Sequence, residues 1–179
     1  MVIEVEMKFK LKDLQELEYQ LIEVGAKLGE IVIQRDQYFK HPSRDFAQTD
    51  EALRIREDGN ITSLTYKGPK FDAKSKTRVE HNIAIADAAK LAEVLEALGF
   101  TRVLIVSKER KIYNYKDVEF CLDEVEGLGS YLEVETIVQQ KKDYQKALEN
   151  LEKLLLDFNI DSTTNIRTSY LELLLEKNE

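Results

Sequence analysis

The first residues that could do chemistry are Glu4, Glu6 and Lys8, which alternate with apolar residues near the start of the chain. In a β-strand successive side chains point to opposite faces, so these three project from one face. Two carboxylates there suit a hard divalent cation, and an ammonium suits an anion. A solvated edge strand is the plain alternative for one strand by itself. The interpretation depends on whether other strands carry charge in the same way.

The same alternation of charge recurs along the chain. Further charged residues that lie opposite apolar stripes are Arg54, Arg56, Lys67, Arg78, Glu80, Lys108, Arg110, Asp123, Glu133 and Glu135. Basic side chains that converge from several strands suit a polyanion with several phosphate oxygens. Carboxylates on adjacent strands suit divalent cations such as Mg²⁺. These groups predict a metal-triphosphate site held by side chains, because the sequence has neither a P-loop nor a dinucleotide-binding glycine motif.

Local patterns predict the elements that must position these side chains. Strands are expected at 3–10, 31–39, 53–56, 61–67, 76–85, 103–113, 118–125 and 131–138. Helices are expected at about 13–25, 87–98, 143–158 and 170–175, with Asp13 and Asp87 as N-caps and Gly25 and Gly99 at the helix ends. Residues 41–50 are expected to form a loop, and the polar residues 71–75 a loop over the mouth of the site.

The two halves of the chain repeat one another. An offset of 74 residues, which places Val79 on Val5 (79 − 5), also pairs Glu6 with Glu80, Asp13 with Asp87, Leu17 with Leu91, Leu21 with Leu95 and Gly25 with Gly99. Each half, at about 2–85 and 76–138, is a strand, a helix and three more strands, and C-terminal helices follow at about 143–177. We therefore expect one α+β domain over 1–179: an eight-stranded antiparallel barrel, closed or nearly closed, with flanking helices and a pseudo-twofold repeat.

Composition limits the classes of partner. The chain has 179 residues, of which 43% are hydrophobic, and a net charge of −8, which argues against a general nucleic-acid coat. No stretch approaches the roughly 20 apolar residues that a membrane-spanning helix needs. The single cysteine, Cys121, cannot form an internal disulfide, and the charged first ten residues do not resemble a signal peptide. We expect a cytoplasmic protein that binds neither nucleic acid nor membrane.

The pattern Glu4-x-Glu6-x-Lys8 resembles the ExExK signature of the CYTH superfamily, the triphosphate tunnel metalloenzymes, whose fold is an eight-stranded antiparallel barrel around the substrate. The order of the later charged positions is similar to the family's order, so the resemblance extends over residues 2–138, and the helix at 169–171 is similar as well. The segments 35–39, 44–46, 52–56, 66–69 and 123–129 most resemble class IV adenylyl cyclases. This resemblance implies conversion of ATP to cyclic AMP and pyrophosphate with two divalent ions, Mg²⁺ or Mn²⁺.

The resemblance, together with the chemistry of the side chains, implies a role for each charged position. Glu4, Glu6 and Glu135 are the first choices as metal ligands, and Asp123 and Glu133 are next. The substrate would be bound by Lys8, Arg54, Arg56, Lys67, Lys108, Arg110, Arg78 and Glu80, with Arg78 either holding phosphate or orienting Glu80. Glu4, Glu6, Lys8, Lys108 and Arg110 are expected to act in catalysis, with one ion activating the ribose 3′-hydroxyl and the other stabilising departing pyrophosphate.

Two other functions fit the same residues. A metal-dependent triphosphatase would use water to attack the terminal phosphorus of tripolyphosphate, a nucleoside triphosphate or thiamine triphosphate. A non-catalytic triphosphate-binding module is the third hypothesis, although anion binding alone would not need carboxylate pairs on both the first and the last strand. Arg78 and Glu80 are as readily explained as a structural ion pair. The resemblance and the apolar C-terminal helices suggest a homodimer.

Overall fold

The computed structural model describes residues 3–70 and 78–178, so the loop expected at 71–75 lies outside the described residues. Its strands are β1 (Ile3–Lys10), β2 (Lys27–Lys40), β3 (Ala52–Asp58), β4 (Ile61–Lys70), β5 (Arg78–Ala84), β6 (Thr101–Tyr115), β7 (Val118–Val125) and β8 (Gly129–Val138). Its α-helices are α1 (Gln15–Glu23), α2 (Phe46–Thr49), α3 (Ala88–Ala97), α4 (Tyr144–Asp157) and α5 (Tyr170–Asn178), with 3₁₀ turns η1 (Lys141–Asp143) and η2 (Ser162–Thr164). Each expected element is found, with its ends shifted by a few residues.

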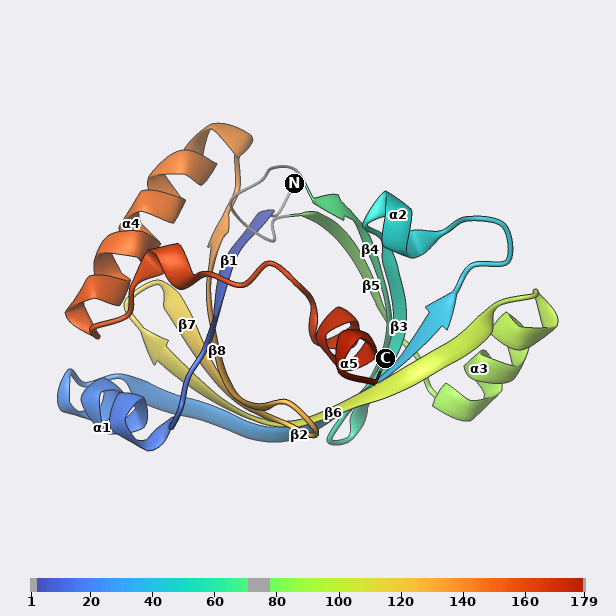
Figure 1. Cartoon of the computed structure of the whole chain (residues 1–179), viewed down its shortest axis with the longest axis horizontal. Coiled ribbons are helices and arrows are strands. Elements are labelled where there is room, and N and C mark those ends of the chain that lie inside the picture. Colours follow the sequence, from blue (N-terminus) through green and yellow to red (C-terminus); the bar gives the residue numbers. More distant parts are fainter. Residues whose placement is uncertain (1–2, 71–77, 179) are drawn as a thin grey trace.

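One antiparallel sheet contains all eight strands, in the order β1-β8-β7-β6-β2-β3-β4-β5. Exchanging each strand of the first half with its counterpart in the second half reproduces this order in reverse, so a pseudo-twofold axis passes between β2 and β6. The sheet curls into a half-barrel, with β1 and β5 as its edges (Figure 1). No ladder joins these two edges among residues 3–70 and 78–178. The predicted fold class and internal repeat are confirmed.

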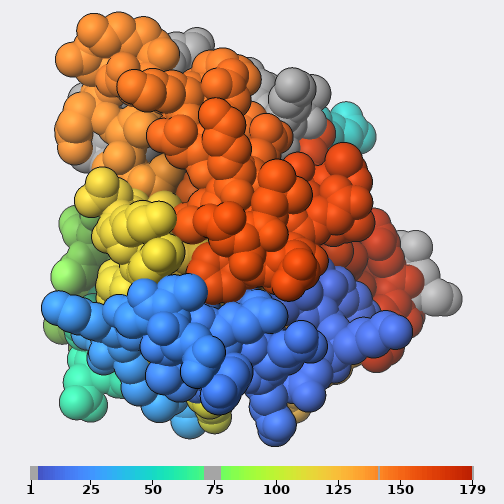
Figure 2. Space-filling view, turned by 90° about the vertical axis from the view of Figure 1, so that its left-hand side faces the viewer, coloured from blue at the N-terminus to red at the C-terminus, as the bar shows by residue number. Residues whose placement is uncertain are grey.

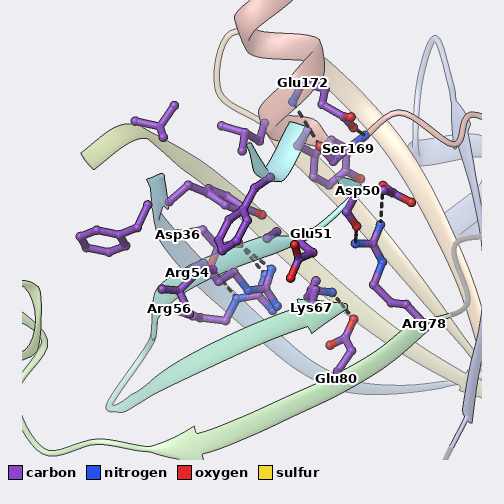
Figure 3. Close-up of a pocket in the computed structure, with 18 of the residues that line it drawn as sticks. Asp36, Asp50, Glu51, Arg54, Arg56, Lys67, Arg78, Glu80, Ser169 and Glu172 are labelled. Atoms are coloured by element: carbon purple, nitrogen blue, oxygen red, sulfur yellow. Dashed lines mark hydrogen bonds and ion pairs between the residues drawn. The ribbon is translucent and has the colours of Figure 1, made fainter. Parts of the chain in front are cut away.

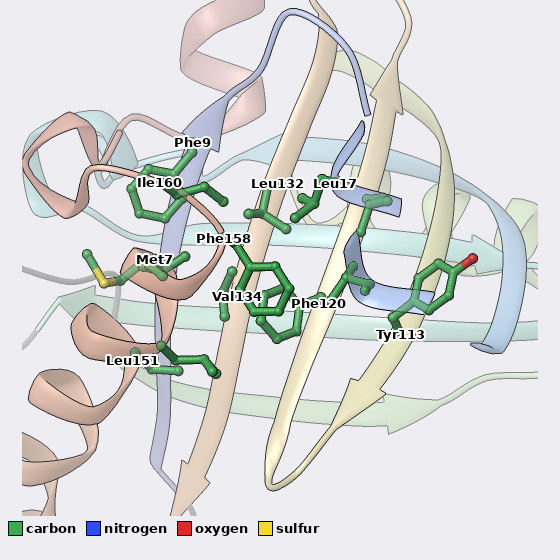
Figure 4. Packing of buried hydrophobic residues seen from close by; sticks show 14 of the residues in the cluster. Met7, Phe9, Leu17, Tyr113, Phe120, Leu132, Val134, Leu151, Phe158 and Ile160 are labelled. Atoms are coloured by element: carbon green, nitrogen blue, oxygen red, sulfur yellow. The ribbon is translucent and has the colours of Figure 1, made fainter. Parts of the chain in front are cut away.

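The outer face of one half is covered by α1 and α4. Leucines at helical spacing on both helices, such as Leu17 and Leu151, are buried against apolar side chains that alternate with the charged residues on the strands. Phe120, Leu132 and Val134 lie at the centre of this cluster (Figure 4). Segments from both ends of the chain share this face, because α4 lies directly above the β1–α1 region (Figure 2). Burying the apolar stripes outward leaves the charged stripes to face the inside of the half-barrel.

The outer face of the other half is covered by α3. Its residues Ala92 and Leu95 are buried with Phe39, Leu53 and Ile55 in a second apolar cluster. This helix begins as predicted, because the side chain of Asp87 accepts a hydrogen bond from the backbone N–H of Lys90 at 2.9 Å.

The equivalent start of α1 differs from the prediction. The N-cap is Leu14, one residue later than expected, and Asp13 instead accepts a bond from the N–H of Gln15 at 2.7 Å. Both predicted helix ends are confirmed, since Gly25 and Gly99 have φ of 80° and 92°, which glycine adopts without strain.

The interval expected to be a loop at 41–50 contains the short helix α2. Asp45 is its N-cap and accepts a hydrogen bond from the N–H of Ala47 at 3.1 Å. Four helical residues are too few to show a helical period, so the N-cap residue Asp45 was the sole local signal of this helix. The helix places Phe46 in the α3 cluster and Asp50, its C-cap, near the ends of β4 and β5.

The segment after α4 crosses the open side of the half-barrel, and α5 lies within its curve (Figure 1). The backbone N–H of Lys8 in β1 donates to Asn165 Oδ1 at 2.9 Å, and the backbone carbonyl of Lys8 accepts from the N–H of Ile166 at 2.7 Å. Helix α5 begins with a capping box, in which Ser169 N–H donates to Glu172 Oε2 at 2.6 Å and Glu172 N–H donates to Ser169 Oγ at 3.2 Å. These contacts satisfy backbone groups on the edge of β1 and place Tyr170 inside the half-barrel.

Within the described residues, every helix is too short or too polar to cross a membrane.

Candidate active site

A cavity of about 380 Å³ opens inside the half-barrel. Eleven of the thirteen predicted site residues line it, namely Glu4, Glu6, Arg54, Arg56, Lys67, Arg78, Glu80, Lys108, Arg110, Glu133 and Glu135. Lys8 and Asp123, the other two, also lie on the inner face of the sheet but are completely buried. Strand alternation therefore places the predicted charges around one space, with two of them beneath its surface.

Three carboxylates meet where β1 and β8 pair. Glu6 lies opposite Glu135 in the ladder, and carboxylate oxygens of Glu4, Glu6 and Glu135 lie within 4.8 Å of one another. Burial and the neighbouring Glu6 carboxylate raise the pKa of Glu4 to about 7, and burial and the Glu4 carboxylate raise the pKa of Glu135 to about 9. An acidic oxygen set of this kind fits a hard divalent cation, and it contains the three residues ranked first as ligands.

The opposite wall, formed by β2 and β3, is basic, and the one carboxylate that these two strands contribute to the cavity lining is Asp36. Arg56 donates from Nε to Asp36 Oδ1 and from Nη2 to Asp36 Oδ2, both at 2.7 Å, and Arg54 Nη1 donates to Asp36 Oδ2 at 2.9 Å (Figure 3). Burial alone would raise the pKa of Asp36, but the two guanidinium groups hold it well below the usual range. The three side chains form a compact cluster whose arginines line the cavity.

A second cluster of this type lies on β6 and β7. Asp123 accepts from Lys108 Nζ at 2.8 Å, from Arg110 Nε and Nη2 at 2.6 Å each, and from the hydroxyl of Tyr170 at 2.8 Å. Arg110 also forms an ion pair with Glu133. Burial would raise the pKa of Asp123, but Lys108 and Arg110 lower it. The structure therefore places Asp123 and Glu133 among bases, while the charge of Glu133 also helps raise the pKa values of Glu4 and Glu135.

The residues at β4 and β5 form separate pairs. Lys67 and Glu80 lie opposite each other and form an ion pair. Arg78 donates from Nη1 to the backbone oxygen of Asp50 at 3.0 Å (Figure 3) and to that of Gly68 at 3.2 Å. The side-chain partner of Glu80 within the described residues is thus Lys67, while Arg78 contacts the C-cap of α2.

The C-terminal segment covers Lys8. The Lys8 ammonium donates to the carbonyl oxygen of Thr168 and lies 4.3 Å from the centre of the Tyr170 ring, a cation–π distance. Lys108 Nζ lies 5.0 Å from the same ring. Tyr170 therefore contacts two of the bases expected to bind phosphate.

Sequence reasoning missed two inward-facing site residues. Asp36 shares its face of β2 with Gln34 and Tyr38, all buried, so the same period of two that revealed Arg54 and Arg56 could have found it. Tyr170 reaches the site from a helix outside the sheet, and no strand pattern could have shown this.

The sequence predicted an eight-stranded antiparallel barrel, closed or nearly closed, with acids and bases inside, and the structure has these charges on the inner face of a half-barrel. A model of the CYTH domain matches residues 2–170. The chain therefore belongs to the CYTH domain family. A Methanocaldococcus jannaschii protein with a provisional adenylate cyclase name is 44% identical over 173 residues, 96% of this chain and 98% of that protein. Adenylate cyclase CyaB of Aeromonas hydrophila is 30% identical over 154 residues, 83% of this chain and 78% of that protein.

Solved structures share the fold. The PH1819 protein of Pyrococcus horikoshii OT3 is 46% identical with a TM-score of 0.89, covering 97% of this chain and 99% of that chain. A Hippeastrum protein, provisionally named an adenylyl cyclase and described as having dominant triphosphatase activity, is 20% identical with a TM-score of 0.60, covering 86% of this chain and 87% of that chain. At this lower identity the likeness concerns the fold alone.

Proposed function

We propose that the protein is a class IV adenylyl cyclase, which converts ATP to cyclic AMP and pyrophosphate with the help of divalent metal ions. The observation that carries the proposal is that a trio of carboxylates and a set of arginines and lysines line one cavity. The adenylate cyclase names of the two relatives support this choice of reaction.

The acidic trio fits the metal side of this reaction. Glu4, Glu6 and Glu135 would hold two ions, Mg²⁺ or Mn²⁺, which when bound activate the ribose 3′-hydroxyl and offset charge on departing pyrophosphate. Because burial beside other carboxylates raises the pKa of Glu4 and Glu135, these side chains must release protons to bind a cation. Asp123 and Glu133, the next choices, contact bases, which favours a role in holding Lys108 and Arg110.

The bases fit the phosphate side. Arg54 and Arg56 on one wall and Lys108 and Arg110 on the other would bind phosphate oxygens, the arginines as planar forks, and stabilise negative charge as pyrophosphate leaves. Lys67 and Arg78 would extend this set along β4 and β5, and Glu80 would complete the substrate site as the ion-pair partner of Lys67. Lys8 belongs to the proposed set as well, but the Tyr170 ring must move before it can reach a substrate.

A product assay tests the proposal. Purified protein is incubated with ATP and Mg²⁺ or Mn²⁺, and nucleotides and phosphates are separated by chromatography. Cyclic AMP with an equal amount of pyrophosphate is the expected result. Orthophosphate without cyclic AMP would replace the cyclase with a triphosphatase, for which tripolyphosphate is the second substrate to assay. Tight ATP binding without turnover would leave a binding module.

A further inference from the structure

Asp36 has a position that the proposed reaction does not by itself explain. Its carboxylate is 3% exposed, lies between two guanidinium groups and accepts three hydrogen bonds from them, at 2.7, 2.7 and 2.9 Å. Arg56 uses two of its nitrogens in a fork, and Arg54 uses one. Both arginines keep donors that Asp36 does not occupy, since each guanidinium has five N–H groups.

We propose that Asp36 is a positioning residue, which fixes the two guanidinium groups of Arg54 and Arg56 in the orientation that receives a triphosphate. The inference rests on the proposed function, because it assumes that these arginines bind phosphate. Two parallel hydrogen bonds fix the plane of Arg56, and the oxygen shared between the arginines fixes their spacing. The ordering of two long side chains is thus complete before a ligand arrives, which reduces the entropy lost on binding.

The unoccupied donors of the cluster support this interpretation. Arg54 Nε is buried and has no hydrogen-bond partner in the described part of the chain. This nitrogen has almost no accessible surface, so a phosphate in the cavity would bond those other donors of Arg54 and Arg56 that border the cavity. The side chains of Arg54 and Arg56 are 12% and 16% exposed, so both border the cavity while remaining well ordered by Asp36.

The same device recurs in the second half of the chain. The offset of 74 residues places Asp36 on Arg110 (36 + 74 = 110), and Asp36 lies opposite Arg56 just as Arg110 lies opposite Asp123. In each half one carboxylate is held by two bases, but the strands that supply acid and base are exchanged. In the second half the bases Lys108 and Arg110 lie on β6 and the acid Asp123 on β7, whereas in the first half the acid lies on β2 and the bases on β3. A cluster built twice on one framework is better explained by a need to order bases than by a chance ion pair.

Charge alone predicts the opposite effect of removing Asp36. If the carboxylate were only a counter-ion, the neutral variant Asp36→Asn would add positive potential to the cavity and bind a polyanion more tightly. If Asp36 positions the arginines, the same variant binds more weakly despite the gain in charge. Asp36→Glu adds a second contrast, because it keeps the charge and moves the carboxylate by one methylene group.

The test is a calorimetric titration of the full chain with inorganic tripolyphosphate, first in metal-free buffer to prevent turnover and then with Mg²⁺. We expect Asp36→Asn and Asp36→Glu each to weaken binding by about tenfold or more, the loss of roughly one charge-assisted hydrogen bond. Asp58→Asn is the matched control: Asp58 faces inward on β3, accepts from Gln34 Nε2 at 2.8 Å and does not line the cavity. It removes the same charge and should leave the affinity unchanged or slightly higher.

Each outcome separates the hypotheses. Wild-type affinity or tighter binding in folded Asp36→Asn, judged by circular dichroism, would overturn the positioning role and leave the triphosphate site intact. If Asp36→Asn does not fold, Asp36→Glu decides, since unchanged affinity in that variant contradicts the proposal. If the wild-type protein binds no tripolyphosphate in either buffer, both the proposed function and this inference fail.

Discussion

The acidic trio, which is partly exposed, and the buried Asp36 show two arrangements of carboxylates around one cavity. Glu4 and Glu135 lie beside other carboxylates, and burial in this company raises their pKa values to about 7 and about 9. Asp36 is buried between Arg54 and Arg56, which lower its pKa in spite of burial. The charge of Asp36 is therefore compensated in the free protein, whereas the trio needs protons or a cation. One region is preorganised, and the other is completed by what it binds.

The largest expected effect comes from removing a charge from the trio. Glu4→Gln and Glu6→Gln should each reduce metal-dependent turnover by about a hundredfold or more, since each removes a proposed cation ligand. The measurement is kcat with saturating ATP and Mg²⁺. The fold should persist, because the replacement relieves repulsion between carboxylates. The control variant is Glu109→Gln, because Glu109 is exposed on the outer face of β6. Activity near the wild-type level in both trio variants would contradict the metal assignment.

Among substitutions of the basic residues, the largest expected effect is a loss of stability. Arg110→Met should lower the free energy of unfolding by about 3 kcal/mol, because it leaves Asp123 and Glu133 buried with fewer positive partners. Urea denaturation followed by circular dichroism measures this loss. Arg35→Met is the matched control: the pair between Arg35 and Glu57 spans 3.3 Å, but its side chains are 47% and 44% exposed. That variant should lose less than about 1 kcal/mol, and equal losses in the two variants would show that burial does not distinguish them.

The pH dependence of stability distinguishes the two kinds of carboxylate. Glu4 keeps its proton up to a pKa of about 7 in the folded protein, compared with 4.5 ordinarily, so its contribution is fully present below pH 4.5 and is lost as the pH rises through 7. Glu4 alone should thus make metal-free protein about 2 kcal/mol less stable at pH 8 than at pH 5.5. Glu135, whose pKa is raised to about 9, adds a loss of the same sign, so Glu4→Gln should remove the Glu4 share and reduce that of Glu135. Asp36, whose pKa is lowered, stays ionised over the same interval and adds no slope.

Adding Mg²⁺ should flatten that slope. A cation that binds the folded protein stabilises it, and more strongly at pH 8, where fewer protons must be displaced from the trio. The measurement is urea denaturation at both pH values with EDTA or with Mg²⁺. Equal stabilisation by Mg²⁺ in Glu4→Gln and wild-type protein would place the cation elsewhere.

The faces of the strands could be predicted from the sequence, but the partners of each carboxylate could not. A period of two was enough to place Asp123 and Glu135 on the inner face. Their environments differ because the ladders set Asp123 opposite Arg110 and Glu135 opposite Glu6. Such register depends on the turns between strands and on tertiary contacts, which periodicity does not reveal.

The position of Tyr170 was beyond prediction for another reason. Its hydrogen bond to Asp123 and its contact with Lys8 depend on the path of residues 165–170 across the open side of the half-barrel. The capping box at Ser169 and Glu172 can be read from the sequence and predicts where α5 begins. It says nothing about which surface receives the helix, since the tertiary contacts of a short segment decide that.

The smallest expected effect concerns the ion pair between Lys67 and Glu80, which joins an acid to a base as Asp36 does but is more exposed to solvent. Lys67 and Glu80 form one acid-base pair at the cavity, and their side chains are 21% and 27% exposed. Solvent weakens such a pair, so Glu80→Gln should lower the free energy of unfolding by less than about 1 kcal/mol. A double-mutant cycle with Lys67→Gln isolates the coupling between the two side chains. A coupling as large as the loss in Arg110→Met would mean that the pair belongs with the buried clusters, and that the preorganised region extends from β3 to β5.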